Sequence, residues 1–362
     1  MKKIGVGILG GTGIVGQNYV KLLQNHPWFE IIDVAASPQS ANKKYADAVK
    51  TKWQMPISVP DTLKNLVVRD VQNLDSINPN LSFVFSAVEM PTKDEIKEVE
   101  LKYAAKGIPV VSNNSAHRWT PDVPMIIAEI NPDHIKMIPI QQKNRGFSKG
   151  FIVVKPNCSL QSFLTPIYAL ENAGYKIEKL IITTLQAVSG AGYPGVASLD
   201  IIENVVPYID GEEEKTEQEP LKILGKVGEK GIINDDSIKI SSTCTRVPVI
   251  DGHTACVNMK FKNNKPTKNE ILKIWTGFES EPQKLGLPFA PKQPIIYLDD
   301  KNRPQPRKDR DNDKAMAVTV GRLRDDNVFD YKFVALSHNL IRGAAGGAIL
   351  NAELLKAKGF IK

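Results

Sequence analysis

Near its start the chain reads Ile4-Gly5-Val6-Gly7-Ile8-Leu9-Gly10-Gly11-Thr12-Gly13-Ile14-Val15-Gly16, and its architecture follows from this stretch. The first six residues form an apolar run typical of a buried strand, and the glycine pattern G-x-G-x-x-G follows at once. Apolar residues then recur at helical spacing, and residues 29–36 predict a second strand. Such glycines let the backbone turn tightly and approach a pyrophosphate at the start of the helix. The stretch therefore predicts a βαβ unit that binds a dinucleotide, although a glycine-rich turn without a ligand has the same pattern.

The residues that end the second strand indicate which dinucleotide is bound. A site selective for NAD usually places an acidic residue there. Here the strand ends in Ala35-Ala36-Ser37-Pro38-Gln39-Ser40, and Asp33 falls inside the strand pattern. Hydroxyl and amide groups, with Lys43 or Lys44 nearby, suit a 2′-phosphate, so the sequence favours NADP; the other interpretation is a solvated polar loop. The residues expected to contact the cofactor are Gly10, Thr12, Gly13, Ile14, Val15, Gly16, Ser37 and Ser40.

Strand and helix patterns continue to alternate after this unit. Residues 81–86 and 108–111 predict strands, residues 94–106 predict an amphipathic helix, and residues 135–150 predict a polar loop. This alternation predicts a mostly parallel, doubly wound sheet. Polar residues follow the strand at 108–111, at the edge where such sheets bind ligands. Arg118 in that segment is either a phosphate ligand or the partner in a surface ion pair.

The second half of the chain has a different pattern. Residues 180–186 are apolar and β-branched, and residues 187–195 form a glycine-rich loop. Residues 238–250 and 255–261 predict two strands joined at Asp251-Gly252-His253, a hairpin-turn signature. The predicted fold class is α/β: an N-terminal Rossmann-like dinucleotide-binding domain followed by an α+β catalytic domain. A helix rich in small residues is expected at 340–355.

Composition argues against several classes of protein. The chain of 362 residues is long enough for two domains, and its net charge of +7 comes from Lys and Arg scattered among acidic residues, which does not favour nucleic-acid binding. No apolar run approaches the length of a membrane span, and no signal peptide is expected. The cysteines Cys158, Cys244 and Cys256 lack disulfide or metal-ligand spacing. We therefore expect a cytoplasmic protein in a reducing compartment, without a metal site.

Cys158 is the main candidate for a reactive group. An apolar run at 151–154 precedes Lys155-Pro156-Asn157-Cys158-Ser159, and apolar residues at helical spacing follow. This pattern predicts that Cys158 lies at a strand-to-helix turn near a helix N-terminus, where the dipole and free N–H groups lower a thiol pKa and stabilise an oxyanion. The alternative is a small buried hydrophobic residue.

A cysteine nucleophile needs a base. Of five histidines, His253 lies at the predicted turn between two strands, from which its side chain can project into a cleft. An imidazole pKa suits removal of a thiol proton near neutral pH, although a turn histidine in water has the same sequence context. A dinucleotide, a thiolate and a histidine together suggest that the sulfur attacks an acyl carbon or an aldehyde and that a hydride is exchanged with the nicotinamide.

Several ordered motifs resemble the aspartate-semialdehyde dehydrogenase family, in its archaeal and fungal branch, over essentially the whole chain. These motifs are Gly10–Gly16, Pro156–Ser159, Leu185–Gly195, Gly211–Lys215, Arg246–His253, Arg303–Arg307, Ser337–Asn339 and Arg342–Gly347. The resemblance implies NADPH-dependent reductive dephosphorylation of L-4-aspartyl phosphate to L-aspartate 4-semialdehyde through a Cys158 thioester. It also implies amino-acid biosynthesis, leading to lysine, threonine and methionine.

The resemblance also implies residue roles. Cys158 is the nucleophile, His253 the acid/base, and Gln186 orients the substrate at the acyl centre. Arg246 binds the substrate carboxylate and Glu212 its amino group, while Lys215, Arg118 and Asn113 hold phosphate. Asn339 is expected near the nicotinamide, and Ser189 and Gly190 complete the cofactor contacts.

The family's organisation implies two domains and a homodimer or homotetramer. We expect residues 1–156 with 340–362 to bind NADP, and residues 157–339 to form the catalytic and dimerisation domain. The chain departs from common family members at Leu160-Gln161-Ser162-Phe163, which is bulkier than the usual small turn, and at Asn42, which stands where glycine is common. These departures bear on the shape of the nicotinamide pocket and on 2′-phosphate recognition.

Two other functions remain open at this point. A malonyl-CoA or succinyl-CoA reductase could use the same scaffold, but its substrate has no amino group, so Glu212 ahead of Lys215 favours the amino-acid substrate. In a run of three acidic residues, however, Glu212 has the sequence context of a solvated helix start. A non-catalytic NADP-binding protein is the other alternative, and an intact set of Cys158, Arg246 and His253 argues against it.

Overall fold

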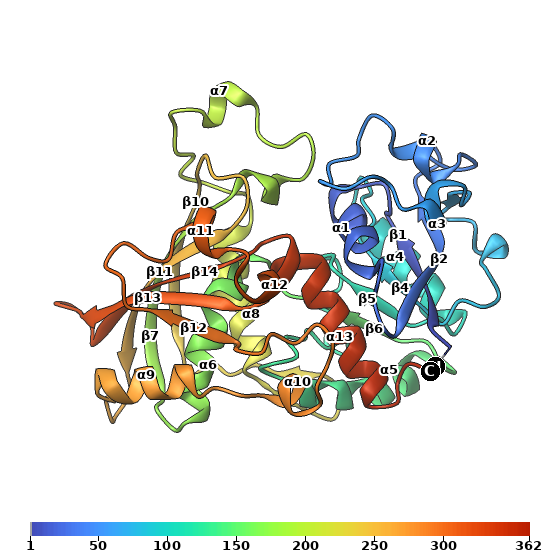
Figure 1. Ribbon diagram of the computed structural model, residues 1–362. Coiled ribbons are helices and arrows are strands. Elements are labelled where there is room, and N and C mark those ends of the chain that lie inside the picture. Colours follow the sequence, from blue (N-terminus) through green and yellow to red (C-terminus); the bar gives the residue numbers. More distant parts are fainter. Residues whose placement is uncertain (1) are drawn as a thin grey trace.

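The computed structural model describes residues 2–362, which form two six-stranded sheets and a small two-stranded one (Figure 1). The first sheet is parallel throughout and has the strand order β3-β2-β1-β4-β5-β6. This is the order of a doubly wound dinucleotide-binding sheet, so the predicted fold of the first half is confirmed. Its strands are β1 (Ile4–Leu9), β2 (Phe29–Ala36), β3 (Arg69–Asp70), β4 (Phe83–Ser86), β5 (Val110–Ser112) and β6 (Ile152–Val154).

Two glycines explain the turn between β1 and helix α1 (Ile14–Leu23). Gly10 has a φ of +79°, and a Cβ atom there would lie 2.2 Å from the carbonyl oxygen of Ala87. A Cβ atom on Gly16 would lie 2.3 Å from the carbonyl oxygen of Gly10. Only glycine therefore allows this tight turn and the close packing of α1 on the strand.

The second sheet is mixed, with the order β10-β7-β11-β14-β13-β12. Its strands are β7 (Ile177–Gln186), β10 (Lys239–Arg246), β11 (His253–Phe261), β12 (Ile295–Leu298), β13 (Val318–Asp325) and β14 (Tyr331–Ser337), and the small sheet pairs β8 (Lys226–Val227) with β9 (Ile232–Ile233). The expected hairpin at 251–253 is wrong, because β7 lies between β10 and β11 and pairs with both. A turn signature is local and cannot reveal that another strand separates the two it connects.

The polar loop expected at 135–150 is also wrong, because helix α5 (Met137–Arg145) occupies most of it. Met137, Ile138 and Gln141 are buried on one face of α5. The Gln141 side chain donates to the carbonyls of Asp122 (2.8 Å) and Ile152 (2.9 Å), so a polar residue replaces an apolar one at a core position. Gly146 ends the helix in the left-handed conformation, with a φ of 66°.

Helices cover both sheets, and the longest is α4 (Lys93–Ala105). Among the described residues, no helix is both long and apolar enough to cross a membrane. The remaining α-helices are α2 (Tyr45–Val49), α3 (Asp61–Lys64), α6 (Leu164–Asn172), α7 (Ser198–Ile201), α8 (Glu212–Ile223), α9 (Lys268–Thr276), α10 (Glu281–Lys284), α11 (Pro306–Asp309), α12 (Asn312–Ala315) and α13 (Gly346–Ala357). Short 3-10 turns are η1 (Leu74–Ser76), η2 (Pro132–Lys136), η3 (Ser159–Ser162) and η4 (Val188–Ala191), and η5 (Ile341–Ala345) is a π-helix.

The end of the chain returns to the first sheet. Segment η5 runs directly into α13, whose position beside the first sheet is visible at the red end of the colour scale in Figure 1. The C-terminal helix shares one buried cluster with the first sheet, including Val6, Ile8, Phe85, Ile341, Ile349, Leu350 and Leu354. The first and last segments of the chain therefore build one core.

Candidate functional site

Three strand ends meet at one edge of the second sheet and carry three of the predicted site residues. Strand β10 runs parallel to β7, and Arg246 pairs directly with Gln186 at the carboxyl end of both. Strand β11 runs antiparallel to β7 and begins with His253, next to the pair of Thr254 with Leu185. Because Arg246 and His253 lie on different strands on either side of β7, their odd spacing in the sequence does not separate them in space.

Cys158 reaches this edge from the first sheet. It follows β6 and is the N-cap residue of η3, so the predicted strand-to-helix turn is confirmed. The side-chain Oδ1 of Asn157 accepts hydrogen bonds from the backbone N–H and the hydroxyl of Ser159, each at 2.7 Å, which fixes the turn. Cys158 Sγ lies 3.3 Å from Nε2 of His253.

The hydrogen bonds of His253 determine which ring nitrogen carries its proton. The backbone N–H of Ala187 donates to Nδ1 at 3.0 Å, so the neutral ring carries its proton on Nε2, which faces the sulfur. His253 is fully buried. Burial, followed by the positive charge of Arg246, lowers the pKa of His253 to about 3, so the ring is neutral at physiological pH.

The pKa of the Cys158 thiol shifts in the opposite direction to the one expected. Burial and the carboxylate of Glu212 raise it to about 11, against the lowering effect of Lys155, Arg118 and Arg246. The prediction relied on a helix dipole, but η3 is a single four-residue turn and has little dipole to offer. Charged side chains from other elements, which the local sequence does not reveal, determine the charge of this sulfur.

Glu212 lies at the centre of a buried polar cluster. Its carboxylate accepts hydrogen bonds from Nδ2 of Asn157 (2.7 Å), from Nε2 of Gln186 (3.1 Å) and from Nζ of Lys215 (2.9 Å). Glu212 is 7 % exposed, so the alternative of a solvated helix start is wrong. The start of α8 thus brings a carboxylate and an ammonium group, Glu212 and Lys215, to the edge that holds Cys158.

Arg118 is buried and held on three sides. Its Nη1 pairs with Glu219 at 2.9 Å, its Nε donates to the Lys155 carbonyl at 3.0 Å, and its Nη2 donates to the Asn113 carbonyl at 3.2 Å. The alternative of a surface ion pair is therefore wrong. The amide of Asn113 instead donates to the hydroxyl of Tyr19 and so ties this residue to helix α1.

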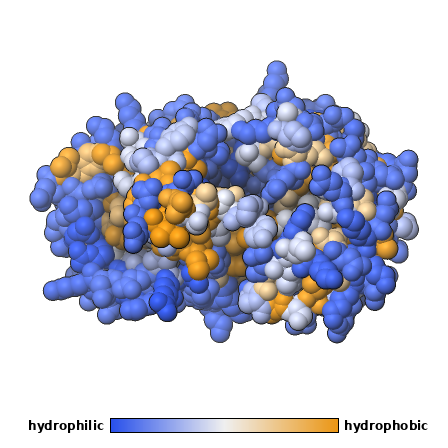
Figure 2. Space-filling model, turned by 90° about the horizontal axis from the view of Figure 1, so that it is seen from above, coloured by the Kyte–Doolittle hydropathy of each residue, from blue (hydrophilic) through white to orange (hydrophobic). Residues whose placement is uncertain are grey.

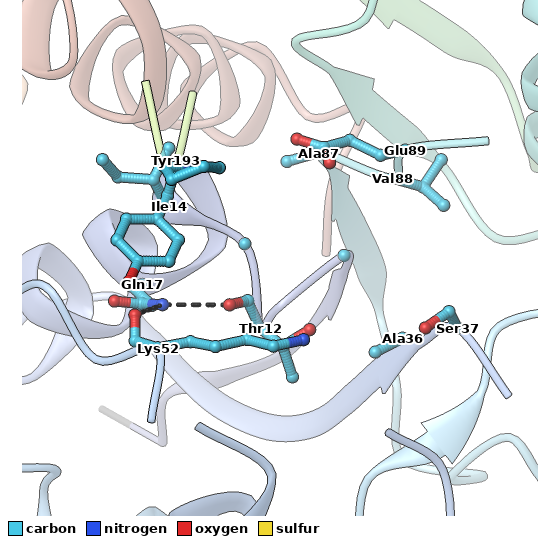
Figure 3. A pocket seen from close by; sticks show the side chains of 13 residues that line it. Thr12, Ile14, Gln17, Ala36, Ser37, Lys52, Ala87, Val88, Glu89 and Tyr193 are labelled. Carbon is cyan, nitrogen blue, oxygen red and sulfur yellow. Dashed lines mark hydrogen bonds between the residues drawn. The ribbon is translucent and has the colours of Figure 1, made fainter. Parts of the chain in front are cut away.

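A cavity of about 410 Å³ opens at the glycine turn of the first sheet (Figure 3). Of the residues expected to contact a cofactor, Gly10, Thr12, Gly13, Ile14 and Ser37 line it. Val15, Gly16 and Ser40 do not line it; Gly16 and Ser40 are buried, and Val15 packs against the hydrophobic core of the first sheet. Asp33, which lies too early in β2 for a ribose contact, pairs with Arg69 instead.

Ser189, Gly190 and Asn339 do not line this cavity. Nδ2 of Asn339 donates to the hydroxyl of Ser189 (2.8 Å), and its Oδ1 accepts from the N–H of Gly252 (2.8 Å). A Cβ atom on Gly190 would lie 2.9 Å from Nη1 of Arg246 and 3.2 Å from Nε2 of His253. These three residues therefore lie beside the edge that holds Cys158 and His253.

Several residues that line the cavity were not expected from the sequence. They are Gln17, Ala36, Lys52, Ala87, Val88, Glu89, Tyr193 and Pro194. The amide of Gln17 donates to the carbonyls of Thr12 and Lys52, each at 2.9 Å, and so ties the glycine turn to the segment that carries Lys52 (Figure 3). Lys43, the expected charge partner, instead donates to the carbonyl of Gln39. It could have been inferred that Ala87, Val88 and Glu89 line the cavity, because they follow β4 at the ligand-binding edge of the sheet.

The arrangement suits covalent chemistry without a metal ligand set. Residues 2–362 contain no group of three or more His, Cys, Asp or Glu side chains placed to hold a metal ion. The site instead brings together a thiol, a histidine that donates from Nε2, a buried carboxylate and several buried cations. Such a site can bind an anionic substrate, attack a carbonyl carbon and stabilise the oxygen that becomes charged.

Comparison with known proteins supports, over the whole chain, the family that the sequence motifs resemble. Residues 5–138 match the family model "Semialdehyde dehydrogenase, NAD binding domain", and residues 164–342 match "Semialdehyde dehydrogenase, dimerisation domain". The aspartate-semialdehyde dehydrogenase of Schizosaccharomyces pombe is 42% identical, over 98% of this chain and 99% of that protein. The enzyme of the same name from Methanothermobacter thermautotrophicus is 44% identical, over 97% of this chain and 99% of its own length.

A solved structure is similar over the same length. The crystal structure of aspartate-semialdehyde dehydrogenase with NADP from Candida albicans has a TM-score of 0.90 and 40% identity to this chain. The match covers 99% of this chain and 100% of that one. The match between the two structures therefore includes both sheets and the C-terminal helix.

Proposed function

The chain belongs to the aspartate-semialdehyde dehydrogenase family, and from that premise we propose that it catalyses the NADPH-dependent reductive dephosphorylation of L-4-aspartyl phosphate to L-aspartate 4-semialdehyde. The observation that carries this proposal is the contact of Cys158 Sγ with His253 Nε2 at 3.3 Å, beside a buried carboxylate and a buried arginine. The reaction is reversible, and it places the enzyme in amino-acid biosynthesis.

The covalent step is assigned to Cys158. The sulfur attacks the acyl carbon, the carbon–sulfur bond forms, and phosphate leaves with its bonding electrons to give a thioester. NADPH, when bound, supplies the hydride that reduces this carbon; the carbon–sulfur bond then breaks, its electrons stay on the sulfur, and the aldehyde is released. His253 acts as the acid and base at the reacting oxygen, because its Nε2–H faces the sulfur and can donate to an oxygen that gains charge beside it.

The charged residues around the sulfur match the ends of the substrate. Arg246 presents a guanidinium fork to the α-carboxylate, and Glu212 accepts from the α-ammonium group. Gln186 orients the substrate at the acyl centre, and its hydrogen bond to Glu212 holds it there. Lys215 and Arg118 bind the phosphate, with Asn113 supporting Arg118 through its backbone carbonyl.

The residues of the glycine-turn cavity fit NADP. The turn at Gly10 and Gly13 suits a pyrophosphate, Lys52 brings a positive charge to the cavity, and Ser37 brings a hydroxyl. The end of β2 offers no acidic residue for a ribose 2′-hydroxyl, since Asp33 is paired with Arg69. Ser189, Gly190 and Asn339 support the nicotinamide end next to Cys158.

The dimerisation-domain match supports an oligomer, and we infer a homodimer or a homotetramer. Large apolar side chains that are exposed in the single chain gather in the segment around α7; they are Tyr193, Leu199, Ile202, Val205 and Tyr208, with Ile250 nearby. Figure 2 shows apolar side chains on the face that carries this segment.

We assign residues 1–156 with 340–362 to the NADP-binding domain and residues 157–339 to the catalytic and dimerisation domain. We also place the enzyme in the cytoplasm.

The substrate is tested by running the reaction in both directions with competing acyl groups. We expect NADPH formation from aspartate semialdehyde only when inorganic phosphate is present, and no NADPH oxidation with malonyl-CoA or succinyl-CoA. The buried pair of Glu212 and Lys215 is the reason, since a CoA thioester of these acids has no ammonium group for Glu212. Activity with the CoA thioesters alone would leave Cys158 in its role but overturn the proposed substrate.

A further inference from the structure

Glu219 is a fully buried carboxylate in helix α8 to which the proposed mechanism gives no role. Its Oε1 accepts a hydrogen bond from Nη1 of Arg118 at 2.9 Å, and its Oε2 accepts one from the backbone N–H of Asn157 at 2.6 Å. Arg118 binds phosphate in the proposed function, and Asn157 immediately precedes Cys158. The two oxygens of one carboxylate thus connect the phosphate site with the turn that carries the nucleophile.

One face of α8 lies along that turn. Glu212, Thr216 and Glu219 are spaced i, i+4 and i+7, which places them on the same side of a helix. Glu212 accepts from Nδ2 of Asn157 at 2.7 Å, and the hydroxyls of Thr216 and Ser159 lie 3.5 Å apart. The same helix therefore holds Asn157 twice, by its side chain through Glu212 and by its backbone through Glu219.

Arg118 is held by the same helix and by the segment that leads to the nucleophile. Its Nε donates to the carbonyl of Lys155 at 3.0 Å, and its Nη2 donates to the carbonyl of Asn113 at 3.2 Å. With the bond to Glu219, three of the five N–H groups of a guanidinium are used, and two remain for a ligand. Lys222, which lies one turn after Glu219, donates to the carbonyl of Arg118 at 2.7 Å. Helix α8 thus fixes both the side chain and the backbone of Arg118.

A carboxylate is the group that suits this position. Arg118 and Asn157 each direct an N–H group at residue 219, and a carboxylate accepts on both oxygens without donating. A glutamine has one accepting oxygen, so its NH2 group would face one of the two donors. Because a buried donor without an acceptor is unfavourable, glutamine has to give up one of the two contacts.

We propose that Glu219 is a positioning residue that holds the phosphate-binding side chain of Arg118 and the Cys158 turn in one fixed geometry. The inference rests on the proposed function, in which the sulfur and the phosphate both approach the same acyl carbon. Displacing a reacting group by an ångström costs about 100-fold in rate, so a fixed separation of the two sites favours thioester formation and its reversal. Glu219 acts through Arg118 and Asn157 and does not touch the substrate.

The test is the kinetics of phosphate-dependent NADPH formation by Glu219→Gln, with phosphate and aspartate semialdehyde varied separately. We expect the KM for phosphate to rise at least about tenfold and the KM for the semialdehyde to stay within about twofold, because Arg246 and Glu212 are unchanged. Removal of a negative charge beside the phosphate site would by itself lower the KM for phosphate. A rise therefore indicates positioning, and a lower or unchanged KM for phosphate overturns the proposal.

A double-mutant cycle with Arg118→Lys tests whether Glu219 acts through Arg118. Lysine keeps the positive charge but lacks the planar fork that Glu219 orients. In the Arg118→Lys background, we expect Glu219→Gln to raise the KM for phosphate by less than about threefold. Equal increases in the two backgrounds would mean that the two residues act independently, and they would overturn the proposal.

Glu217→Gln is the matched control on the same helix. Oε1 of Glu217 accepts from the backbone N–H of Ser242 at 2.8 Å and from its hydroxyl at 3.3 Å. This carboxylate also holds a backbone N–H, but it does so in β10 rather than in the Cys158 turn. Both KM values should stay within about twofold of those of the natural protein. A rise in the KM for phosphate equal to that of Glu219→Gln would indicate a general effect on α8 and overturn the proposal.

Glu219→Asp covers the case in which Glu219→Gln fails to fold. Aspartate keeps the negative charge beside Arg118, but its side chain is one carbon shorter and reaches only one of the two N–H groups. We expect the KM for phosphate to rise at least about fivefold, with the KM for the semialdehyde again within about twofold. Two unchanged KM values overturn the proposal. If the natural protein forms no NADPH in the presence of phosphate, the proposed function itself fails, and this inference fails with it.

Discussion

The cavity at the glycine turn and the edge that holds Cys158 are built in different ways. The cavity takes Gly10, Thr12, Gly13 and Ile14 from one continuous turn, and adds residues from loops next to it. The edge around Cys158 combines η3, the ends of β7 and β10, the start of β11 and the start of α8. The first site depends on the conformation of one segment, whereas the second depends on the packing of the whole chain. A substitution can therefore disable one site and spare the other.

Cys158→Ala is expected to produce the largest difference between the effects on the two sites. Removing the sulfur removes the covalent intermediate, so turnover should fall by about 10⁴-fold or more. The cavity at the glycine turn has no contact with this side chain, so NADPH affinity should stay within about threefold of the natural protein. Steady-state rates and titration of NADPH fluorescence measure the two effects. Turnover close to that of the natural protein would remove Cys158 from the covalent step.

Gly10→Ala should produce the opposite result. The new Cβ would lie 2.2 Å from the carbonyl of Ala87, and the φ of +79° disfavours any side chain, so the turn must move. We expect NADPH affinity to fall roughly 30- to 100-fold, on the order of 2–3 kcal/mol, while Cys158 keeps its alkylation rate.

Gly146→Ala is the matched control for that variant. Gly146 also has a positive φ, +66°, but a Cβ there meets nothing within 4 Å. It carries the conformational cost without the steric overlap, so it should lose about 1 kcal/mol of stability and keep its NADPH affinity. Equal losses of affinity in the two variants would mean that the glycine turn does not hold the cofactor.

The smallest expected effect is on the pH dependence of stability. It compares two buried histidines, His117 beside the first sheet and His253 at the edge that holds Cys158. His117 follows β5 in the first half, and burial lowers its pKa to about 4; burial lowers the pKa of His253 to about 3. Both folded-state pKa values lie below the unfolded value of about 6.5. The unfolded chain therefore binds more protons as the pH falls from about 6.5 towards 4, and stability falls in that window and is regained as the pH rises.

His117→Gln tests this dependence. The His117 ring nitrogens lie within 3.1 Å of the Thr120 hydroxyl and 3.3 Å of the Lys97 carbonyl, which a glutamine amide can also reach. The variant should lose about 1 kcal/mol less than the natural protein between pH 7.5 and pH 5.5, as measured by urea unfolding. Parallel pH profiles for the two proteins would show that His117 is protonated to the same extent in both states.

The same contrast explains what could be predicted from the sequence. Strands β1 and β2 match the predicted ranges, because continuous apolar runs and a glycine turn specify them locally. The helix at 137–145 was missed because Gln141 fills a core position with an amide. The turn at 251–253 could not reveal that β7 separates the strands on either side of it.

The electrostatics of the thiol were the least predictable part. The residues near Cys158 were found from motifs, but its pKa depends on Glu212, Lys155, Arg118 and Arg246, which come from four separate segments. Lys155 was visible in the sequence beside the nucleophile and gave no signal, because nothing in a single sequence shows that its side chain is buried without a carboxylate. Burial and ion pairing are tertiary properties.

The return of the C-terminal helix to the first sheet also has a consequence for synthesis on the ribosome. Residues 341–355 complete the core that β1 and β4 begin, and Gly343 and Gly347 lie against Cys158 and Lys155. The half that is made first is thus completed by residues that are made much later. A nascent chain cannot close the pocket around Cys158 until residues 341–355 have been made, and a chain that stops short of α13 lacks both part of its core and the wall behind the Cys158 thiol.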